Sequence, residues 1–380
     1  MFGYYHQTRV FLKMNRLSNN QEAFLVLLRA GLWENEVGLS QFDNIDYEEI
    51  YRLAVEQSVV GLVAAGIEHV VDVRISKEVA LKFVVGALQL EHRNAAMNEF
   101  VANIIELLRK ENVNALLVKG QGIAQCYVRP LWRTCGDVDL LLSKDNYEVA
   151  KNKLVQIASS TDDEDGKRKH LSLTIDPWVL ELHGTLRTGL WKRLESVLDS
   201  AQDEVLYDGN VRLWLNGNTQ VFLMRADEDI FFVFSHILQH FFVKGIGLRQ
   251  ICDWCRLLYV YKDKIDIKLL ERRLKTGRLM REWRVFAALA VDHLGMPAEA
   301  MPLYEMSTCW SKKANKVMSL ILETGNFGQS RDETYKTKYS TVIRYFISFY
   351  RHTSDMLRKA MVFPLDSFRT WLRVMWNSVK

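Results

Sequence analysis

The chain has 380 residues and a formal net charge of +4, with 50 Lys and Arg against 46 Asp and Glu. This near-neutral balance argues against obligate wrapping of nucleic acid, so we expect no stable DNA binding, although a local basic patch is compatible with it. Hydrophobic residues (48%) and charged residues (25%) have the proportions of an ordinary globular protein. The length predicts two or three domains.

The cysteines, the N-terminus and the prolines narrow the class of protein further. Five cysteines in a long chain do not have the pattern of a disulfide framework, which favours a reducing, cytoplasmic setting. Residues 1–14 lack the apolar run of a signal peptide, and no stretch of about 18 uncharged apolar residues predicts a transmembrane helix. Only five prolines and many periodic stretches indicate a helix-rich protein.

Residues 1–95 are predicted to form a helical region without catalytic groups. After a loosely held arm, apolar spacing predicts a helix over 21–32. Asp46, with a glutamate three positions later, has the pattern of a capping box for the next helix. Ser76 starts a long helix that we expect to end near residue 111.

The motif with the most chemical content is Gly-Asp-Val-Asp-Leu-Leu-Leu at 136–142, within a predicted domain over 96–225. In a strand, successive side chains alternate faces, so Asp137 and Asp139 point the same way. Two ionised carboxylates held this close raise one another's pKa. A bridging divalent cation relieves that repulsion, and hard oxygen ligands suit Mg²⁺.

A glycine turn, Lys119-Gly120-Gln121-Gly122, precedes this motif and follows an apolar, strand-like run over 115–118. Glycines let backbone N–H groups approach an anion, and the helix predicted over 121–127 would present its N-terminus to a phosphate. A phosphate cradle followed by Asp-x-Asp is an arrangement suited to nucleotidyl transfer.

Two further strands are predicted over 170–175 and 179–183, joined by a turn at Asp176-Pro177. Alternation places Glu181 and His183 on the same face of the second strand. A carboxylate in an otherwise apolar strand needs a reason: it either serves a site or faces water at a sheet edge. His183 either contacts a substrate or is a hydrogen-bonded structural histidine.

Three more elements complete this domain: a helix over 145–158 with Val149, Leu154 and Ile157 inward, a helix over 185–198, and a hairpin turning at Asn216-Gly217-Asn218. The charge-rich loop over 159–169 separates the first helix from the strands, and its consecutive carboxylates are expected to be solvated.

These motifs resemble the DNA polymerase β-type nucleotidyltransferase superfamily, whose pattern is a glycine turn, a short helix and an Asp-x-Asp between hydrophobic residues. The chain looks most like the uncharacterised bacterial nucleotidyltransferase family. Its members carry a Lys-Gly turn, an Arg shortly before the carboxylates, and Asp-x-Asp followed by aliphatic residues. Here those positions are Lys119-Gly120, Arg133 and Asp137-Val138-Asp139.

The resemblance implies an α+β fold, with a small mixed β-sheet nucleotidyltransferase domain flanked by N- and C-terminal helical regions. It also implies a metal site for Mg²⁺ or Mn²⁺, with Glu181 as the third carboxylate beside Asp137 and Asp139. The triphosphate would bind the glycine turn and Arg133. In the superfamily the turn is Gly-Gly or Gly-Ser, whereas here it is Gly120-Gln121. Without that serine, phosphate binding would rely on backbone N–H groups, Lys119 and Arg133.

Residues 226–330 are predicted to form a helical C-terminal domain. A very apolar helix over 230–242 carries His236 and His240 four residues apart, hence on one face. Zinc requires three or four protein ligands, and no third ligand stands at a characteristic spacing, which disfavours a zinc site. The Cys252-x-x-Cys255 pair lies within a helical apolar pattern, so we expect buried thiols.

The block from Lys244 to Trp254 has a counterpart in the family, where paired histidines precede a Gly-containing turn and a helix with Arg and Asp. We expect this block, with Lys244 and Arg249, to line the cleft opposite the metal site and to hold base, ribose or acceptor. Plain helix packing, with Arg249 paired to Asp253, is the alternative.

The last segment, 331–380, holds ten Lys or Arg against four Asp or Glu and is dense in aromatic residues. Pro364 divides it into two amphipathic helices. A helical hairpin packed on the body is the favoured interpretation, and peripheral contact with an anionic membrane is the alternative.

The predicted function is transfer of NMP from an NTP, with ATP the first choice, to an acceptor hydroxyl with release of pyrophosphate. The acceptor stays open among small molecules, proteins and RNA. The alternative is a non-catalytic nucleotide-binding or scaffold protein on the same fold, apposed to a membrane through its tail.

Overall fold

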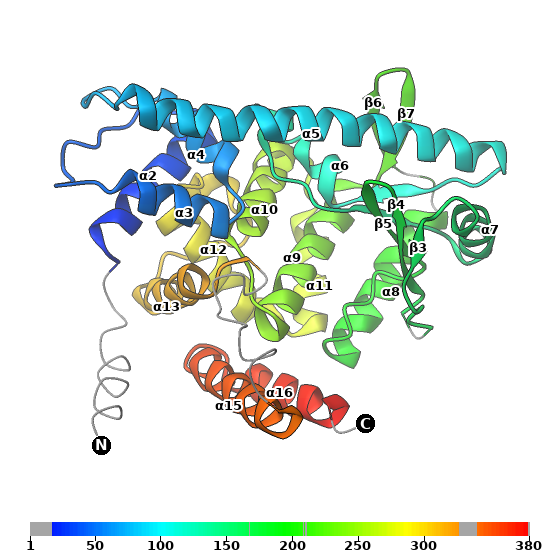
Figure 1. Cartoon of the computed structure of the whole chain (residues 1–380). Helices are drawn as coiled ribbons and strands as arrows, with labels where there is room; N and C mark the ends of the chain where they lie inside the picture. Colours follow the sequence, from blue (N-terminus) through cyan, green and yellow to red (C-terminus); the bar gives the residue numbers. More distant parts are fainter. Residues whose placement is uncertain (1–16, 167, 208, 210, 327–339, 379–380) are drawn as a thin grey trace.

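The computed structural model describes residues 17–378 except 167, 208, 210 and 327–339, so the predicted N-terminal arm lies outside the described residues (Figure 1). Within the described part, helices at both ends of the chain flank a seven-stranded mixed sheet. This architecture confirms the α+β prediction. No helix among the described residues is both long enough and apolar enough to cross a membrane.

The N-terminal helices are α2 (Asn19–Trp33), α3 (Tyr47–Glu56), α4 (Val60–Glu68) and α5 (Lys77–Lys110). Three of these four helices begin after a polar cap, and α4 begins after Val59 without one. Ser76 caps α5, as predicted, through a hydrogen bond from the N–H of Val79. Asp46 caps α3 by accepting from two N–H groups of the first turn. The predicted capping box is not closed there, because the Glu49 side chain pairs with Arg52 instead.

The sheet contains seven strands. They are β1 (Leu116–Val118), β2 (Val138–Leu141), β3 (Ser160–Thr161), β4 (His170–Ile175), β5 (Trp178–His183), β6 (Arg212–Asn216) and β7 (Thr219–Leu223). Their order is β3-β4-β5-β2-β1-β7-β6. The central β2 runs parallel to β5 and antiparallel to β1, which brings together strands that are distant in the sequence.

One face of the sheet is apolar and covered. Leu140, Leu180 and Leu182 are fully buried in a cluster that includes side chains of α5 and of α7 (Lys144–Val155). Figure 1 shows α5 running along the whole length of this side of the molecule. Because strand side chains alternate, the polar residues of the same strands project from the opposite face.

Two helices of the C-terminal half, α9 (Ala226–Val243) and α10 (Leu248–Tyr261), line a cavity together with that opposite face. Further helices of this half are α8 (Lys192–Tyr207), α11 (Ile267–Gly277), α12 (Met280–Leu294) and α13 (Thr308–Thr324), and the short 3-10 turns are η2 (Pro130–Trp132), η3 (Lys262–Lys264) and η4 (Ala298–Ala300). The short helix α6 (Gly120–Ala124) follows β1. Helix α9 is apolar on nearly all sides and lies at the centre of the larger hydrophobic core.

Helices α15 (Thr341–Ala360) and α16 (Pro364–Ser378) form a hairpin, with Pro364 in the first turn of α16. The connecting Val362 and Phe363 are buried in the core, and the Phe363 ring packs against Phe241 of α9. This confirms the packed hairpin. Aromatic side chains such as Trp376, 70% exposed, remain on its outer side, and membrane contact there stays a prediction.

Two details of the central domain differ from prediction. The helix expected from residue 185 begins only at Lys192, because Gly189 adopts a left-handed backbone with φ of 72° that interrupts helical geometry. In α7 the buried face consists of Tyr147, Ala150 and Leu154. The expected inward residues Val149 and Ile157 are 44% and 47% exposed, because the aromatic Tyr147 sets a different apolar stripe.

A contact between α12 and the α15–α16 hairpin is expected to make the free energy of unfolding depend on pH. The carboxyl of Glu282 on α12 hydrogen-bonds Asp366 on α16, with Arg193 of α8 and Arg369 of α16 also near Asp366. Burial and then Asp366 raise the pKa of Glu282 to about 8. The folded protein therefore holds a proton there that the unfolded chain has released, so the free energy of unfolding falls as pH rises from 4.5 towards 8.

Glu282→Gln keeps the shape of the side chain and removes the titration, so we expect it to flatten this decline. Urea unfolding of both proteins between pH 5 and 9 measures the effect. Parallel pH profiles of wild type and variant would contradict it.

Candidate active site

The polar face of the sheet, α9 and α10 enclose a cavity of about 400 Å³. Its lining includes eight of the nine residues predicted for the site: Lys119, Gly120, Arg133, Asp137, Asp139, Glu181, Lys244 and Arg249. Residues of the predicted catalytic domain and of the predicted helical domain thus meet at one hollow, as expected for the cleft.

Three carboxylates converge on this cavity from neighbouring strands. Asp139 lies directly opposite Glu181 in the parallel pair β2–β5, and Asp137 precedes Asp139 by two residues on the same face. Oxygen atoms of the three lie within 4.8 Å of one another. The neighbouring Asp139, and then burial, raise the pKa of Asp137 above its usual value. Such a repulsive set of hard oxygen donors fits a divalent cation such as Mg²⁺.

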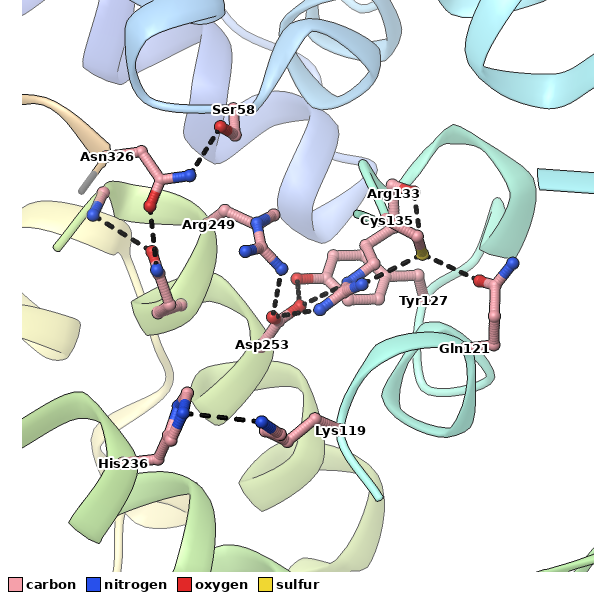
Figure 2. Close-up of polar contacts among 12 residues, drawn as sticks. Ser58, Lys119, Gln121, Tyr127, Arg133, Cys135, His236, Arg249, Asp253 and Asn326 are labelled. Carbon is pink, nitrogen blue, oxygen red and sulfur yellow. Dashed lines mark hydrogen bonds and ion pairs between the residues drawn. The ribbon is translucent and has the colours of Figure 1, made fainter. Parts of the chain in front are cut away.

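Lys119 extends towards these carboxylates from the end of β1. Its Nζ lies 2.7 Å from Asp139 Oδ1, in a pair that is almost buried. Figure 2 shows its other contact, with His236 Nε2 at 3.5 Å. Burial alone would lower the pKa of Lys119, but Asp139, Asp137 and Glu181 raise it. Its backbone has φ of 57° and ψ of −144°, a conformation that costs a residue with a Cβ about 1–3 kcal/mol. Strain of this kind clusters at functional sites in proteins.

Two histidines flank Glu181. His183 Nε2 lies 2.8 Å from Asp139 Oδ1 and 3.5 Å from Glu181 Oε2, and His170 Nε2 lies 3.1 Å from the same Glu181 oxygen. Burial would lower the pKa of His183, but its hydrogen bonds to Asp139 and Glu181 raise it. For Glu181, burial is outweighed by His170 and His183, which lower the pKa of the carboxyl. Glu181 thus lies on an interior strand and lines the cavity, so it does not face water at a sheet edge.

His170 was missing from the sequence prediction, although a signal for it was present. Alternation places it on the face of Ser172 and Thr174, away from the buried leucines. The two-residue turn at Asp176-Pro177 then fixes the register and sets His170 directly opposite His183. Counting outward from the turn would have paired the two histidines.

Arg133 lies in the wall of the cavity, where its guanidinium forms a two-pronged ion pair with Asp253 of α10 (Figure 2). The distances are 3.0 Å from Nε and 2.6 Å from Nη2 to the two carboxylate oxygens, and both side chains are nearly inaccessible. Tyr127 donates a 2.7 Å hydrogen bond to Asp253, and Arg249 lies 3.6 Å from it. The donors of Arg133 thus face protein groups, and the alternative pairing of Arg249 with Asp253 is present in looser form.

Gln121 and Gly122 of the glycine turn do not line the cavity. The Gln121 side chain is buried, accepts a hydrogen bond from Cys135 Sγ at 2.7 Å and donates to the carbonyl of Asn94. A Cβ at Gly122 would lie 2.9 Å from the Leu223 side chain, so this glycine allows α6 to approach β7. The glutamine that replaces the familiar serine thus has a place in the core beside Cys135.

His236 and His240 lie one turn apart on α9, with Nε2 atoms 3.0 Å apart. Burial and then Lys119 lower the pKa of both imidazoles, that of His240 to about 3, so the pair is neutral. Among the residues that the structure describes, two groups of three side chains could hold a metal ion. One consists of Asp137, Asp139 and Glu181, the other of His170, Glu181 and His183, and neither contains His236 or His240. Cys252 and Cys255 are buried free thiols, as predicted.

The mixed sheet thus presents three carboxylates and a lysine to one cavity. The family model described as "uncharacterised nucleotidyltransferase" matches residues 43–295, which is more than half of the chain and includes every predicted site residue. The chain therefore belongs to the uncharacterised nucleotidyltransferase family. Comparisons with curated proteins and with solved structures gave no match.

Proposed function

We propose that the protein is a nucleotidyltransferase with the DNA polymerase β-type mechanism, which transfers NMP from an NTP, with ATP the first candidate, to an acceptor hydroxyl. The observation that carries this proposal is the convergence of Asp137, Asp139 and Glu181 within 4.8 Å, beside Lys119, in a member of a nucleotidyltransferase family. These carboxylates would hold Mg²⁺ or Mn²⁺. A bound cation would supply charge neutralisation at the α-phosphate and a lower pKa for the acceptor hydroxyl.

The chain's own residues would bind and orient the nucleotide. Lys119 and the N–H of Gly120 lie at the carboxylate end of the cavity, and Lys244 and Arg249 line its other wall. We propose that Lys119 and the N–H of Gly120 bind phosphate oxygens. Lys244 and Arg249 would bind the base or ribose of the nucleotide, or the acceptor. Arg133, held by Asp253, would orient Arg249 through the carboxylate they share. Preorganised cations of this kind stabilise charge that develops in the transition state.

The acceptor and the setting are further parts of this proposal. As acceptor we propose a small hydroxyl compound, a protein side chain or an RNA end. The cysteines that the structure describes are free thiols, which supports a reducing, cytoplasmic setting. The non-catalytic scaffold is the second candidate, and the specific observation in its favour is that Lys119 already pairs with Asp139.

Calorimetric titration of the full chain with each of the four NTPs, in Mg²⁺ and in EDTA, tests the proposal. We expect one NTP to bind with Mg²⁺ and to lose at least about tenfold in affinity in EDTA, because the cation links the phosphates to the carboxylates. Asp137→Asn/Asp139→Asn should lose the Mg²⁺-dependent part.

The matched control is Asp162→Asn/Asp163→Asn, which removes two exposed carboxylates from the loop after β3 and should bind like wild type. Nucleotide binding that is equal with Mg²⁺ and EDTA would favour the scaffold. The absence of binding for all four NTPs would contradict the transfer proposal and would also favour the scaffold.

A further inference from the structure

A cluster of nitrogen and oxygen ligands lies next to the three carboxylates. His170, Glu181 and His183 come from the antiparallel pair β4–β5, where His170 is directly opposite His183. Their ring centroids are 4.8 Å apart, and one ligand atom from each of the three residues lies within 4.8 Å of the others. Glu181 belongs to both this cluster and the carboxylate cluster.

The distances between these side-chain atoms are close to those between the ligand atoms of a coordinated metal ion. Metal–nitrogen and metal–oxygen bonds of about 2.0–2.2 Å in a tetrahedron separate neighbouring ligand atoms by about 3.3–3.6 Å. The two histidine nitrogens lie 3.1 and 3.5 Å from Glu181 Oε2. A cation could therefore enter with small side-chain rotations. The three side chains are between 15% and 31% exposed, and all line the cavity, which leaves a path for an ion and open coordination positions.

We propose that His170, Glu181 and His183 form a second cation site, which takes a borderline transition-metal ion of the Mn²⁺, Co²⁺ or Zn²⁺ class rather than Mg²⁺. Two imidazoles and one carboxylate are ligands that such ions prefer, whereas Mg²⁺ prefers oxygen and retains its waters. Sharing of Glu181 would couple this ion to the one at Asp137 and Asp139, as in two-metal sites. The role of the neighbouring ion rests on the proposed function; the histidine site rests on its own ligands.

An ion-pair network without a metal is the competing explanation. In that case His183 would be a cation between Asp139 and Glu181, and His170 would serve only as a hydrogen-bond partner of Glu181. The two explanations differ in what His170 does, because a hydrogen bond to Glu181 survives in a glutamine but a metal–imidazole bond does not. His170 is therefore the position to change.

Full-length protein freed of metal with EDTA and then dialysed is titrated with Co²⁺, whose visible absorption bands report nitrogen coordination and coordination number. We expect wild type to bind Co²⁺ with the intense bands of a four- or five-coordinate ion, and a large excess of Mg²⁺ should not remove them. His170→Gln should weaken Co²⁺ binding by at least about 100-fold, because loss of even an outer-shell partner costs 10–100-fold.

Two further variants guard against misfolding as an explanation. His170→Cys offers a thiolate ligand in the same place, so it should restore Co²⁺ binding and add a sulfur-to-cobalt charge-transfer band. His92→Gln changes an exposed histidine of α5 and should leave the spectrum unchanged. Circular dichroism melts confirm that each variant is folded.

Unchanged Co²⁺ spectra and affinity in His170→Gln, or full displacement of Co²⁺ by Mg²⁺, would overturn the inference and leave the ion-pair network. Calorimetry of the NTP and Mg²⁺ on the same variants separates this result from the proposed function. Nucleotide binding retained in His170→Gln with Co²⁺ binding lost supports both proposals. Co²⁺ binding that depends on His170 in a protein that binds no NTP supports the metal site and rejects the nucleotidyltransferase.

Discussion

Asp137→Asn is expected to lower the rate of nucleotidyl transfer by about a thousandfold or more while the midpoint of thermal unfolding stays equal or rises. A catalytic cation contributes several kcal/mol of charge stabilisation in the transition state, and each 1.36 kcal/mol is a factor of ten in rate. We expect the fold not to need this carboxylate. Asp137 is less buried than Asp139, and its neighbour Asp139 raises its pKa by repulsion, so the neutral amide relieves unfavourable energy.

Release of pyrophosphate from the NTP identified by calorimetry, with candidate acceptors present, measures the rate, and circular dichroism measures the unfolding midpoint. The exposed pair Asp162→Asn/Asp163→Asn again serves as the control and should change neither. A loss of activity that came with a fall in the midpoint would indicate a structural role for Asp137. Full activity in the variant would refute the metal assignment.

Asp139 would not serve this comparison equally well. Its Oδ1 contacts both the Lys119 ammonium and the His183 imidazole, and its side chain is 2% exposed. An asparagine there would leave two buried partners without the negative charge that pairs with them. Lost activity and lost stability would then coincide. The split between rate and stability is therefore expected at Asp137 alone of the pair.

Strand alternation made the face of each carboxylate predictable, while the resemblance supplied Glu181 as the third carboxylate beside Asp137 and Asp139. A period of two is a local property, so the position of Asp137 relative to Asp139, and of Glu181 relative to the buried leucines, follows from a few consecutive residues. Likewise the side chain of Ser76 caps the start of α5, and the Asn216-Gly217 turn joins the two strands of a hairpin. These elements lie where the sequence predicted them.

Features that depend on distant partners were not predictable in this way. The seven-strand order joins β1 to β7 across more than a hundred residues, and nothing local in Leu116–Val118 specifies that neighbour. Arg133 and Asp253 are separated by 120 positions. The sequence indicated an arginine for phosphate, whereas the fold surrounds that guanidinium with Asp253 and Cys135.

The second large effect is expected for this buried ion pair. Asp253→Ala should lower the free energy of unfolding by about 3–5 kcal/mol, because it leaves the Arg133 guanidinium buried without its partner. It also leaves the Tyr127 hydroxyl without its acceptor. Urea unfolding monitored by circular dichroism measures the change.

The exposed pair of Arg187 and Asp199 is the matched control. It has the same two-pronged geometry, at 2.7 and 2.6 Å, but its side chains are 44% and 37% exposed. Asp199→Ala should therefore cost no more than about 1 kcal/mol. Similar losses at the two sites would show that burial does not set the strength of the Arg133 pair.

The double variant Arg133→Met/Asp253→Leu then separates structure from function. Apolar residues of similar volume remove both buried charges, so the double variant should be more stable than Asp253→Ala alone. If Arg133 only joins the loop before β2 to α10, Mg²⁺-dependent NTP binding should largely return with that stability. If Arg133 also orients Arg249 towards the nucleotide, as proposed, the double variant should fold and still bind the NTP at least about tenfold more weakly. In the folded protein Asp253 contacts both Arg133 and Arg249. Loss of NTP affinity in a stable double variant would therefore mean that the buried Arg133–Asp253 pair, besides stabilising the fold, holds Arg249 in place at the cavity.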